Sequence, residues 1–73
     1  PTTTIEFSLP HSSHLTLKIY SILGEEVATL ASGDFSPGRY RADWNARGVA
    51  SGVYMYRLYT PQLVETRKLV LLR

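Results

Sequence analysis

The stretch GVYMYRLYTPQLVETRKLVLLR, residues 52–73, contains two apolar segments separated by a turn. The first segment is too apolar for simple alternation, which predicts a strand covered on both sides, with Arg57 on its less buried face. That face is shared by Val53, Met55 and Tyr59. Proline at the second position of residues 60–63 favours a type I turn. We therefore expect the two segments to pair as antiparallel strands, with residues 63–72 as the closing strand.

Three segments further upstream alternate between apolar and polar residues, which is the period of a half-buried strand. Their apolar positions are Ile5, Phe7 and Leu9, then Leu15, Leu17 and Ile19, then Tyr40, Ala42 and Trp44. Pro10 and the polar residues 11–13 end the first run, so we expect the first two runs to form a hairpin. Ser36-Pro37-Gly38 precedes the third run and predicts a type II turn with a positive φ at Gly38.

Residues 19–30 allow two interpretations. The apolar positions with the spacing of an amphipathic helix are Ile19, Ile22, Leu23, Val27 and Leu30. Gly24 would cost such a helix about 1 kcal/mol relative to alanine, and the preceding LTLKIY has no N-cap residue. The pattern alone leaves residues 22–31 open between strand and helix, and we favour two strands joined around residues 23–25. With the other runs, these strands predict an all-β sandwich.

Length and composition limit the possible functions. A chain of 73 residues with 44% hydrophobic content forms a single domain, which buries only about 60% of its unfolded surface. There is no cysteine for a disulfide or a thiolate metal site. The eight basic and six acidic residues give a net charge of +2 but are scattered, so no nucleic-acid partner is predicted. No apolar run approaches the roughly 18 residues of a membrane-spanning helix, and the first residues lack the pattern of a signal peptide.

Candidate catalytic and metal-binding residues form no recognisable set. His11 and His14 lie three apart in a predicted turn, but zinc needs three or four protein ligands, and no cysteine or third histidine supplies them. The acidic residues lie mostly at turns or on outward positions. No serine lies in a G-x-S-x-G motif, and the glycine spacing matches no phosphate-binding loop. We therefore predict no metal, no cofactor and no enzymatic activity in this domain.

Most aromatic residues share the apolar faces of predicted strands, where core packing is their usual role. Tyr20 and Tyr59 are the two tyrosines predicted to point outward. An exposed, coplanar pair of rings can stack on sugars. A carbohydrate-binding module therefore stays open as an alternative, with Tyr20 and Tyr59 as its candidate glycan-stacking residues.

The order of several motifs adds a resemblance to a known family. The blocks are PTTTIEFSLP, LTLKIYSILGEEVATL, SPGRYRADWNARGVASGVYMYRL and VETRKLVLLR, in this order over nearly the whole chain. The sequence resembles the C-terminal sorting domains of bacterial type IX secretion cargo, which are similar to the Ig-like module of flagellar hook-capping proteins. The resemblance implies a small Ig-like antiparallel β-sandwich of about six or seven strands. Two features depart from the family pattern: no Asn-Pro-Phe-Asn-like stretch precedes the first block, and residues 60–62 lack the more usual glycine or asparagine.

The resemblance also implies a function. Such a domain is a non-catalytic module that directs export of its parent protein across the outer membrane and its attachment to the cell surface. Its partners would be the outer-membrane secretion machinery and, in relatives that are cleaved, a surface lipopolysaccharide. We expect residues 1–73 to be a monomeric domain from the C-terminus of a larger secreted or cell-surface protein, such as a glycoside hydrolase or a peptidase. An inert spacer or adhesive Ig-like module is the alternative.

The terminal segment is the candidate recognition site. Its residues are Lys68, Leu69, Val70, Leu71, Leu72 and Arg73. Consecutive apolar residues put side chains on both faces of a strand, and we expect a thin sandwich to bury one set and leave the other partly exposed. We predict that a receptor docks on this strand, by side-chain contact or by β-augmentation, and that the flanking bases set its orientation. In the alternative interpretation, the four apolar residues simply close the core.

Overall fold

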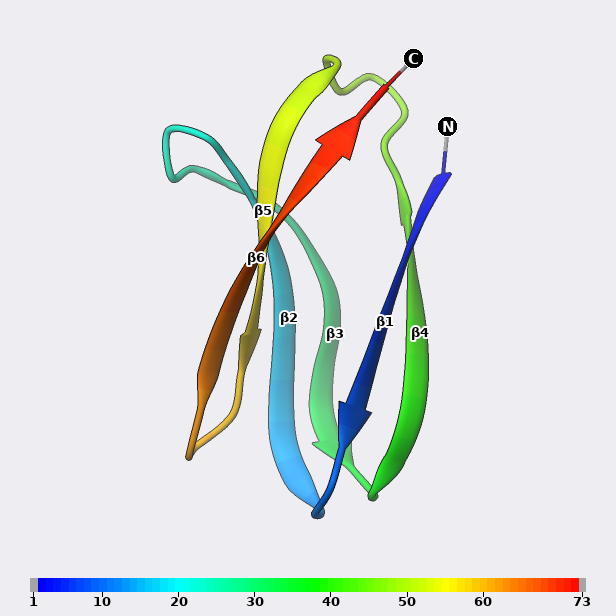
Figure 1. The fold of residues 1–73 in the computed structure, drawn as a ribbon, viewed down its shortest axis with the longest axis vertical. Helices are drawn as coiled ribbons and strands as arrows, with labels where there is room; N and C mark the ends of the chain where they lie inside the picture. Colours follow the sequence, from blue (N-terminus) through cyan, green and yellow to red (C-terminus); the bar gives the residue numbers. More distant parts are fainter. Residues whose placement is uncertain (1, 73) are drawn as a thin grey trace.

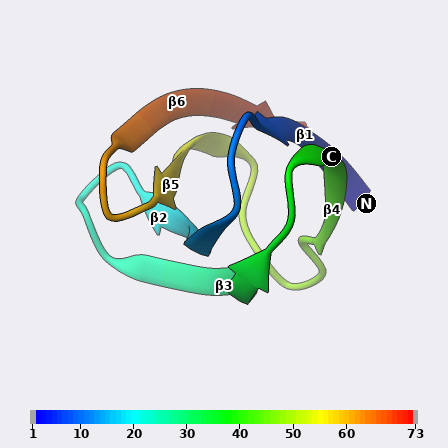
Figure 2. The ribbon, with the colours of Figure 1, turned by 90° about the horizontal axis from the view of Figure 1, so that it is seen from below.

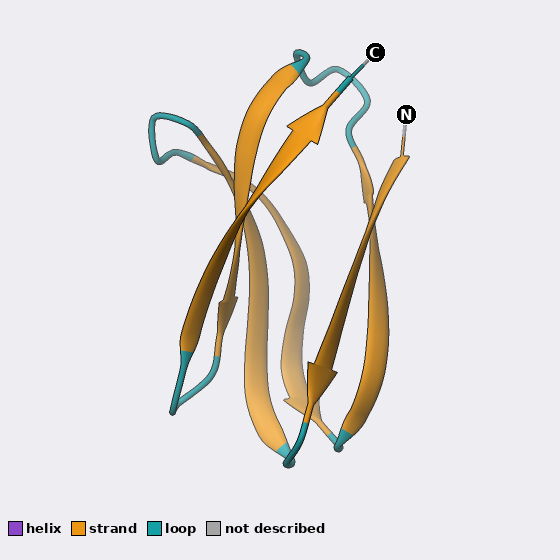
Figure 3. Cartoon of the chain, in the orientation of Figure 1, coloured by secondary structure: helices purple, strands orange, loops and turns teal. Residues whose placement is uncertain are grey.

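The computed structural model describes residues 2–72, which form six β-strands joined by short loops and no helix (Figure 1 and Figure 3). The strands are β1 (Thr2–Leu9), β2 (Ser13–Ser21), β3 (Glu26–Phe35), β4 (Gly38–Asn45), β5 (Gly52–Tyr59) and β6 (Val64–Leu71). They make two antiparallel sheets, one of β1 and β4 and one in the order β3-β2-β5-β6. Seen along the long axis in Figure 2, β1 and β4 lie together on one side of the molecule. The predicted all-β sandwich is confirmed.

The segment that allowed a helix forms two strands and a turn. β2 ends at Ser21 and β3 begins at Glu26, so the strands join around residues 23–25 as expected. The inward side chains of β2 have no exposed surface, and they are Leu15, Leu17 and Ile19. A period of two keeps all three on the core face, whereas a helix beginning at Ile19 would turn the chain away from that face. The helix interpretation is therefore wrong.

The predicted hairpin of the first two runs is also wrong. β1 pairs with β4 along its whole length, while β2 pairs with β3 and β5. The chain crosses from one sheet to the other at residues 10–12. Ile5 and Leu9 of β1 therefore join one buried cluster with Leu15 and Leu17 of β2. Two alternating runs bury their apolar faces against each other when they lie in opposite sheets, and this burial outweighs a local hairpin.

The connection before β4 differs from the predicted turn. The chain changes sheet between Phe35 and Gly38, and Gly38 is the first residue of β4. The φ of Gly38 is positive, as expected, but its value is 149°. A type II turn needs a φ of about +80° at this glycine. The connection is therefore a crossover between the two sheets and not the tight type II turn that the sequence predicted.

The C-terminal hairpin forms as predicted. β5 and β6 pair from Tyr59 opposite Val64 to Gly52 opposite Leu71. Two backbone hydrogen bonds close the turn, one donated by the amide of Thr60 at 2.8 Å and one donated by the amide of Leu63 at 3.3 Å. The expectation that β5 is covered on both sides is wrong. Its outer face is half-buried, and no other strand of residues 2–72 lies over it.

An aromatic pair closes the end of the core where β4 leads into β5. Trp44, 3% exposed, and Tyr54 meet edge to face, with ring centroids 5.4 Å apart. The Tyr54 hydroxyl donates a hydrogen bond to the Ala50 carbonyl at 2.6 Å. This contact resembles the tyrosine corner of Ig-like sandwiches, in which a tyrosine hydroxyl bonds back to the chain a few residues upstream. It holds the β4–β5 loop against the core.

We expect Tyr54→Phe to lower the free energy of unfolding by about 1 kcal/mol, because the Ala50 carbonyl loses a partly buried hydrogen bond. For a domain of this size, that change lowers the melting temperature by about 4–8 °C in a circular dichroism scan. Tyr56→Phe is the control, since Tyr56 is half-buried on the same strand and its hydroxyl makes no hydrogen bond within residues 2–72. Equal melting of the two variants would contradict this role of the Tyr54 hydroxyl.

Candidate recognition strand

β6 is an edge strand whose side chains divide between the core and the solvent. Within residues 2–72 it pairs only with β5, so its other backbone edge is unpaired. Leu71 is 2% exposed and Leu69 is half-buried. Val70 is 54% exposed, Leu72 is 79% exposed, and Lys68 is exposed as well. The strand therefore contributes one set of side chains to the core and leaves the other set accessible.

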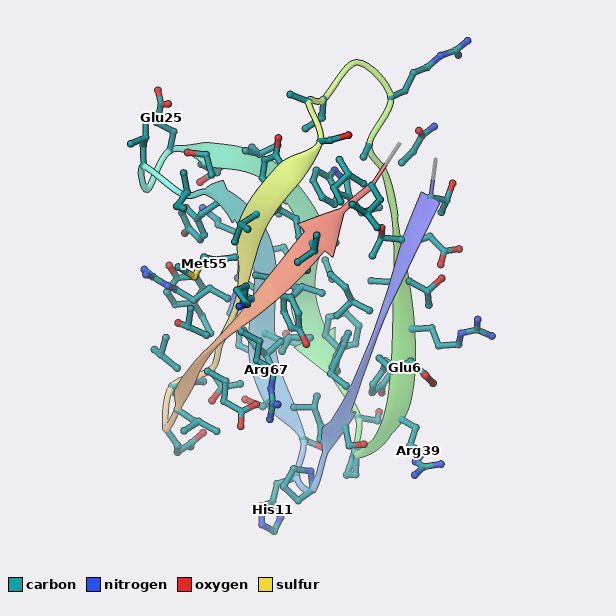
Figure 4. All side chains as sticks on the ribbon, turned by 45° about the horizontal axis from the view of Figure 1, so that its top comes forward. Glu6, His11, Glu25, Arg39, Met55 and Arg67 are labelled. Carbon is teal, nitrogen blue, oxygen red and sulfur yellow. The ribbon has the colours of Figure 1, made fainter. Side chains whose placement is uncertain are left out.

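The basic residues of β6 lie on opposite faces. Arg67 lies opposite Tyr56 on the core side of the sheet, and Lys68 lies opposite Met55 on the outer side. The core side is open near Arg67, because a cleft of about 390 Å³ separates β1 from β6. The cleft is lined by Glu6, Phe7, Ser8, Tyr56, Glu65 and Arg67, two of which Figure 4 labels. Charges on the inner side of an edge strand oppose uncontrolled pairing with another strand. The sixth predicted recognition residue, Arg73, lies outside the described residues.

The outer face of the larger sheet is apolar and partly exposed around Val70. Val53 lies directly opposite Val70, and the next row on this face consists of Tyr20, Met55 and Lys68. Val53 and Met55 are half-buried by their neighbours within the sheet. A partner that contacts Val70 would therefore also meet Val53 and Met55.

A polar network lies on the same face, nearer the β5–β6 turn. The hydroxyl oxygens of Tyr20 and Tyr59 are 2.7 Å apart, and the guanidinium of Arg57 lies 5.0 Å from the centroid of the Tyr20 ring. Arg57 also donates to the Tyr59 hydroxyl at 3.5 Å and to Thr66 Oγ1 at 3.1 Å. The prediction that both tyrosines point outward is correct, and both are half-buried. A sugar stacked on this face of Tyr20 would have to replace the cation–π contact with Arg57.

The network shifts the two phenol pKa values apart. Hydrogen bonds from Tyr20 and from Arg57 lower the pKa of Tyr59, because both donors stabilise its phenolate. The hydrogen bond with Tyr59, together with partial burial, raises the pKa of Tyr20. As the pH rises, Tyr59 therefore ionises first, and Tyr20 keeps its proton in the hydrogen bond between the two oxygens.

The β2–β3 turn exposes two aliphatic side chains to which the sequence pattern assigned no function. Leu23 is 84% exposed and Ile22 is 67% exposed. The sequence pattern places both among the apolar positions of a possible helix. In the two-strand interpretation, Leu23 lies in the predicted turn of residues 23–25 and Ile22 directly before it. That position was the signal that could have identified them, because a turn has no core face to cover its side chains.

The described residues provide no metal-binding group. His14 Nδ1 lies 3.2 Å from Asp34 Oδ1, and both side chains are exposed. No set of three or more His, Cys, Asp or Glu side chains in residues 2–72 is arranged to hold a metal ion. Within the same part of the chain, no polar or charged side chain is buried.

Residues 2–72 form an all-β module with an unpaired edge strand and an outer sheet face that no other strand covers. Residues 1–72 match the family model described as the secretion system C-terminal sorting domain. The chain belongs to this family, as the resemblance predicted. No curated protein and no solved structure matches the chain significantly.

Family membership establishes the function. The domain is a non-catalytic sorting signal of the type IX secretion system, and it interacts with the secretion machinery. A type IX sorting signal implies export across the outer membrane to a secreted or cell-surface location. No helix in residues 2–72 is long and apolar enough to cross a membrane.

We expect Tyr20→Phe to raise the pKa of Tyr59 toward the ordinary tyrosine value, because the Tyr59 phenolate loses its main hydrogen-bond donor. Carbon-13 NMR of labelled tyrosine rings, followed against pH, measures each phenol pKa separately. Tyr40→Phe is the control, since the Tyr40 hydroxyl donates to the Ser36 carbonyl at 2.5 Å, outside the network. An unchanged pKa of Tyr59 in Tyr20→Phe would show that the two hydroxyls do not interact in solution.

Proposed function

We propose that the secretion machinery recognises the domain through β6, and that Lys68, Val70 and Leu72 are the side chains that it contacts. The supporting observation is the division of β6, in which Leu71 is buried while Val70 and Leu72 are 54% and 79% exposed. Large apolar side chains that stay exposed in a patch on a folded domain mark contact surfaces. Leu69 and Leu71 contribute indirectly, because they hold the strand on the core.

The unpaired edge of β6 supports recognition by β-augmentation, in which a receptor segment adds a strand beside β6. Arg67 on one face and Lys68 on the other give the middle of the strand two adjacent positive charges. We infer that the receptor places carboxylates opposite these charges, since opposite charges across a strand pair stabilise it. Arg67 and Lys68 thereby set the register of the added strand. We assign the same role to Arg73 from its position in the sequence.

The same charges support a monomeric domain. Directly opposite side chains of an antiparallel pair lie on the same face, so a pairing of β6 with a second copy of β6 along nearly its full length places either Arg67 opposite Arg67 or Lys68 opposite Lys68. Like charges directly opposite each other destabilise a strand pair. Edge-to-edge dimerisation through β6 is therefore opposed by the sequence of the strand itself.

The family resemblance supports a proposal about the parent protein. We infer that the domain derives from the C-terminus of a larger secreted hydrolase, such as a glycoside hydrolase or a peptidase, which becomes attached to surface lipopolysaccharide. Fractionation of cells that export such a protein tests the attachment. A surface-bound cargo of increased mass supports a covalent link, whereas a cargo found entirely in the medium contradicts it.

The carbohydrate-binding and spacer alternatives stay predictions, and no contact in residues 2–72 favours either of them. Tyr20 and Tyr59 would have to bind a glycan while their hydroxyls hydrogen-bond each other and Arg57 covers one ring. Affinity electrophoresis in soluble xylan measures such binding, and retardation that Tyr20→Ala abolishes would support it.

The sorting function is tested by fusing residues 1–73 to a neutral cargo in a bacterium with a working type IX secretion system. We expect the cargo to reach the cell surface or the medium, because the domain supplies the signal that the machinery recognises. Immunoblots of periplasmic, surface and medium fractions measure its location. A cargo that stays in the periplasm would contradict the sorting function.

In the same assay, we expect Val70→Gln and Lys68→Gln each to reduce export about tenfold, the effect of about 1.4 kcal/mol of lost binding. Both side chains are exposed, so melting should be unchanged. Val64→Gln is the matched control for Val70, because Val64 lies on the same strand and is 55% exposed. Full export of Val70→Gln and Lys68→Gln would count against receptor contact at these positions.

A further inference from the structure

The turn between β2 and β3 presents two large apolar side chains outside the core. Leu23 is 84% exposed and Ile22 is 67% exposed, and neither belongs to the buried cluster or to the residues packed against it. Leu23 is the most exposed of the large apolar side chains in residues 2–72. Adjacent apolar side chains that the core does not use can mark a contact surface.

Hydrogen bonds hold this turn in one conformation. The amide of Ser21 donates to the carbonyl of Glu25 at 2.8 Å, and the amide of Gly24 donates to the carbonyl of Ser21 at 2.9 Å. The hydroxyl oxygen of Ser21 accepts hydrogen bonds from the amides of Leu23 and Glu25, at 3.3 and 3.2 Å. Gly24 has a φ of 90°, a conformation that glycine adopts without strain. Binding through this turn therefore orders little additional backbone.

The hairpin directs the turn away from the sandwich. The pairing of β2 with β3 shifts register between Leu17 and Lys18, and again between Ile19 and Tyr20. Bulges of this kind bend a strand pair and re-aim its end. Figure 1 shows the turn projecting from the side of the molecule, and Figure 4 labels Glu25 at its tip.

The turn lies at the same end of the sheet as the end of β6. Ser21, the last residue of β2, lies opposite Tyr54, and Tyr54 lies opposite Leu69. The chain therefore enters the turn from the row of residues that contains Leu69, with β5 between β2 and β6. Both features lie in the upper part of Figure 1, with the turn on the left and the end of β6 to its right.

Charges beside the turn select the kind of partner. Glu26 forms an ion pair with Lys18 at 2.8 Å. Glu25 is exposed and makes no ion pair within residues 2–72. A free carboxylate next to two aliphatic side chains is repelled by an anionic lipid surface. It is complementary to a protein pocket with an apolar floor and a basic rim.

We propose that Ile22 and Leu23 insert together into an apolar pocket with a basic rim on the outer-membrane secretion machinery, as a second contact beside β6. The inference rests on the proposed function, because it takes the machinery that contacts β6 as the partner. Two contacts at fixed positions on a rigid domain raise specificity. A partner that fits only β6 binds more weakly than one that also has a pocket for Ile22 and Leu23.

The experiment uses the cargo fusion of residues 1–73. We expect the double variant Ile22→Ser with Leu23→Ser to reduce export at least about tenfold without a change in melting. Leu63→Ser is the matched control, because Leu63 is 54% exposed and lies in the turn between β5 and β6, at the other end of the sheet from the β2–β3 turn. A photo-crosslinking amino acid in place of Leu23 should form a crosslink to an outer-membrane protein of the secretion system, and the same group in place of Leu63 should not.

The outcomes separate this inference from the proposed function. Wild-type fusion that stays in the periplasm defeats both, whereas export that depends on Val70 and Lys68 but not on Ile22 and Leu23 overturns only the second contact. Crosslinks from position 23 to lipid alone would also overturn it. A vesicle test can overturn it as well. If the purified domain sediments with vesicles of phosphatidylcholine and phosphatidylglycerol and the double variant does not, then Ile22 and Leu23 bind a membrane and not a protein pocket.

Discussion

The structure depends on the burial of one face of a four-stranded sheet beneath only two strands. The centre of that face is β2, whose Leu15, Leu17 and Ile19 side chains have no exposed surface. β1 and β4 supply the opposite wall of the core, including Ile5 and Trp44. A chain of 73 residues can bury only part of its surface, and the covering sheet of two strands leaves the inner side of β6 open near Arg67.

The two faces of β6 explain how one strand can stabilise the fold and still be available to a receptor. Leu71 belongs to the core cluster, while Val70 and Leu72 stay exposed on the same short segment. The position of β6 at the sheet edge leaves one side of its backbone unpaired. Unpaired edges invite aggregation, and Arg67 and Lys68 oppose it from the two faces of the strand. In our proposal, the features that protect the edge also select the correct partner.

Parts of the candidate site followed from the sequence, and parts did not. Alternation predicted that Tyr20 and Tyr59 point outward, which is correct. Their hydrogen bond and the position of Arg57 over Tyr20 depend on the register between β2 and β5, which no local pattern specifies. The exposure of Leu23 was missed for a related reason. Helical spacing, strand alternation and an apolar turn look alike over a few residues, and only the surrounding core distinguishes them.

The sequence by itself determined the strands, the C-terminal hairpin, the core face of each alternating run and the family, because a period of two and turn chemistry are local properties. Only the tertiary structure decided that β1 pairs with β4 and not with β2, because hydrophobic burial is non-directional and either arrangement satisfies the alternation of β1. It also decided which side of the terminal strand is buried. Leu69 to Leu72 are apolar on both faces, so their local pattern is neutral, and the register of β6 against β5 places Leu71 in the core and Val70 outside.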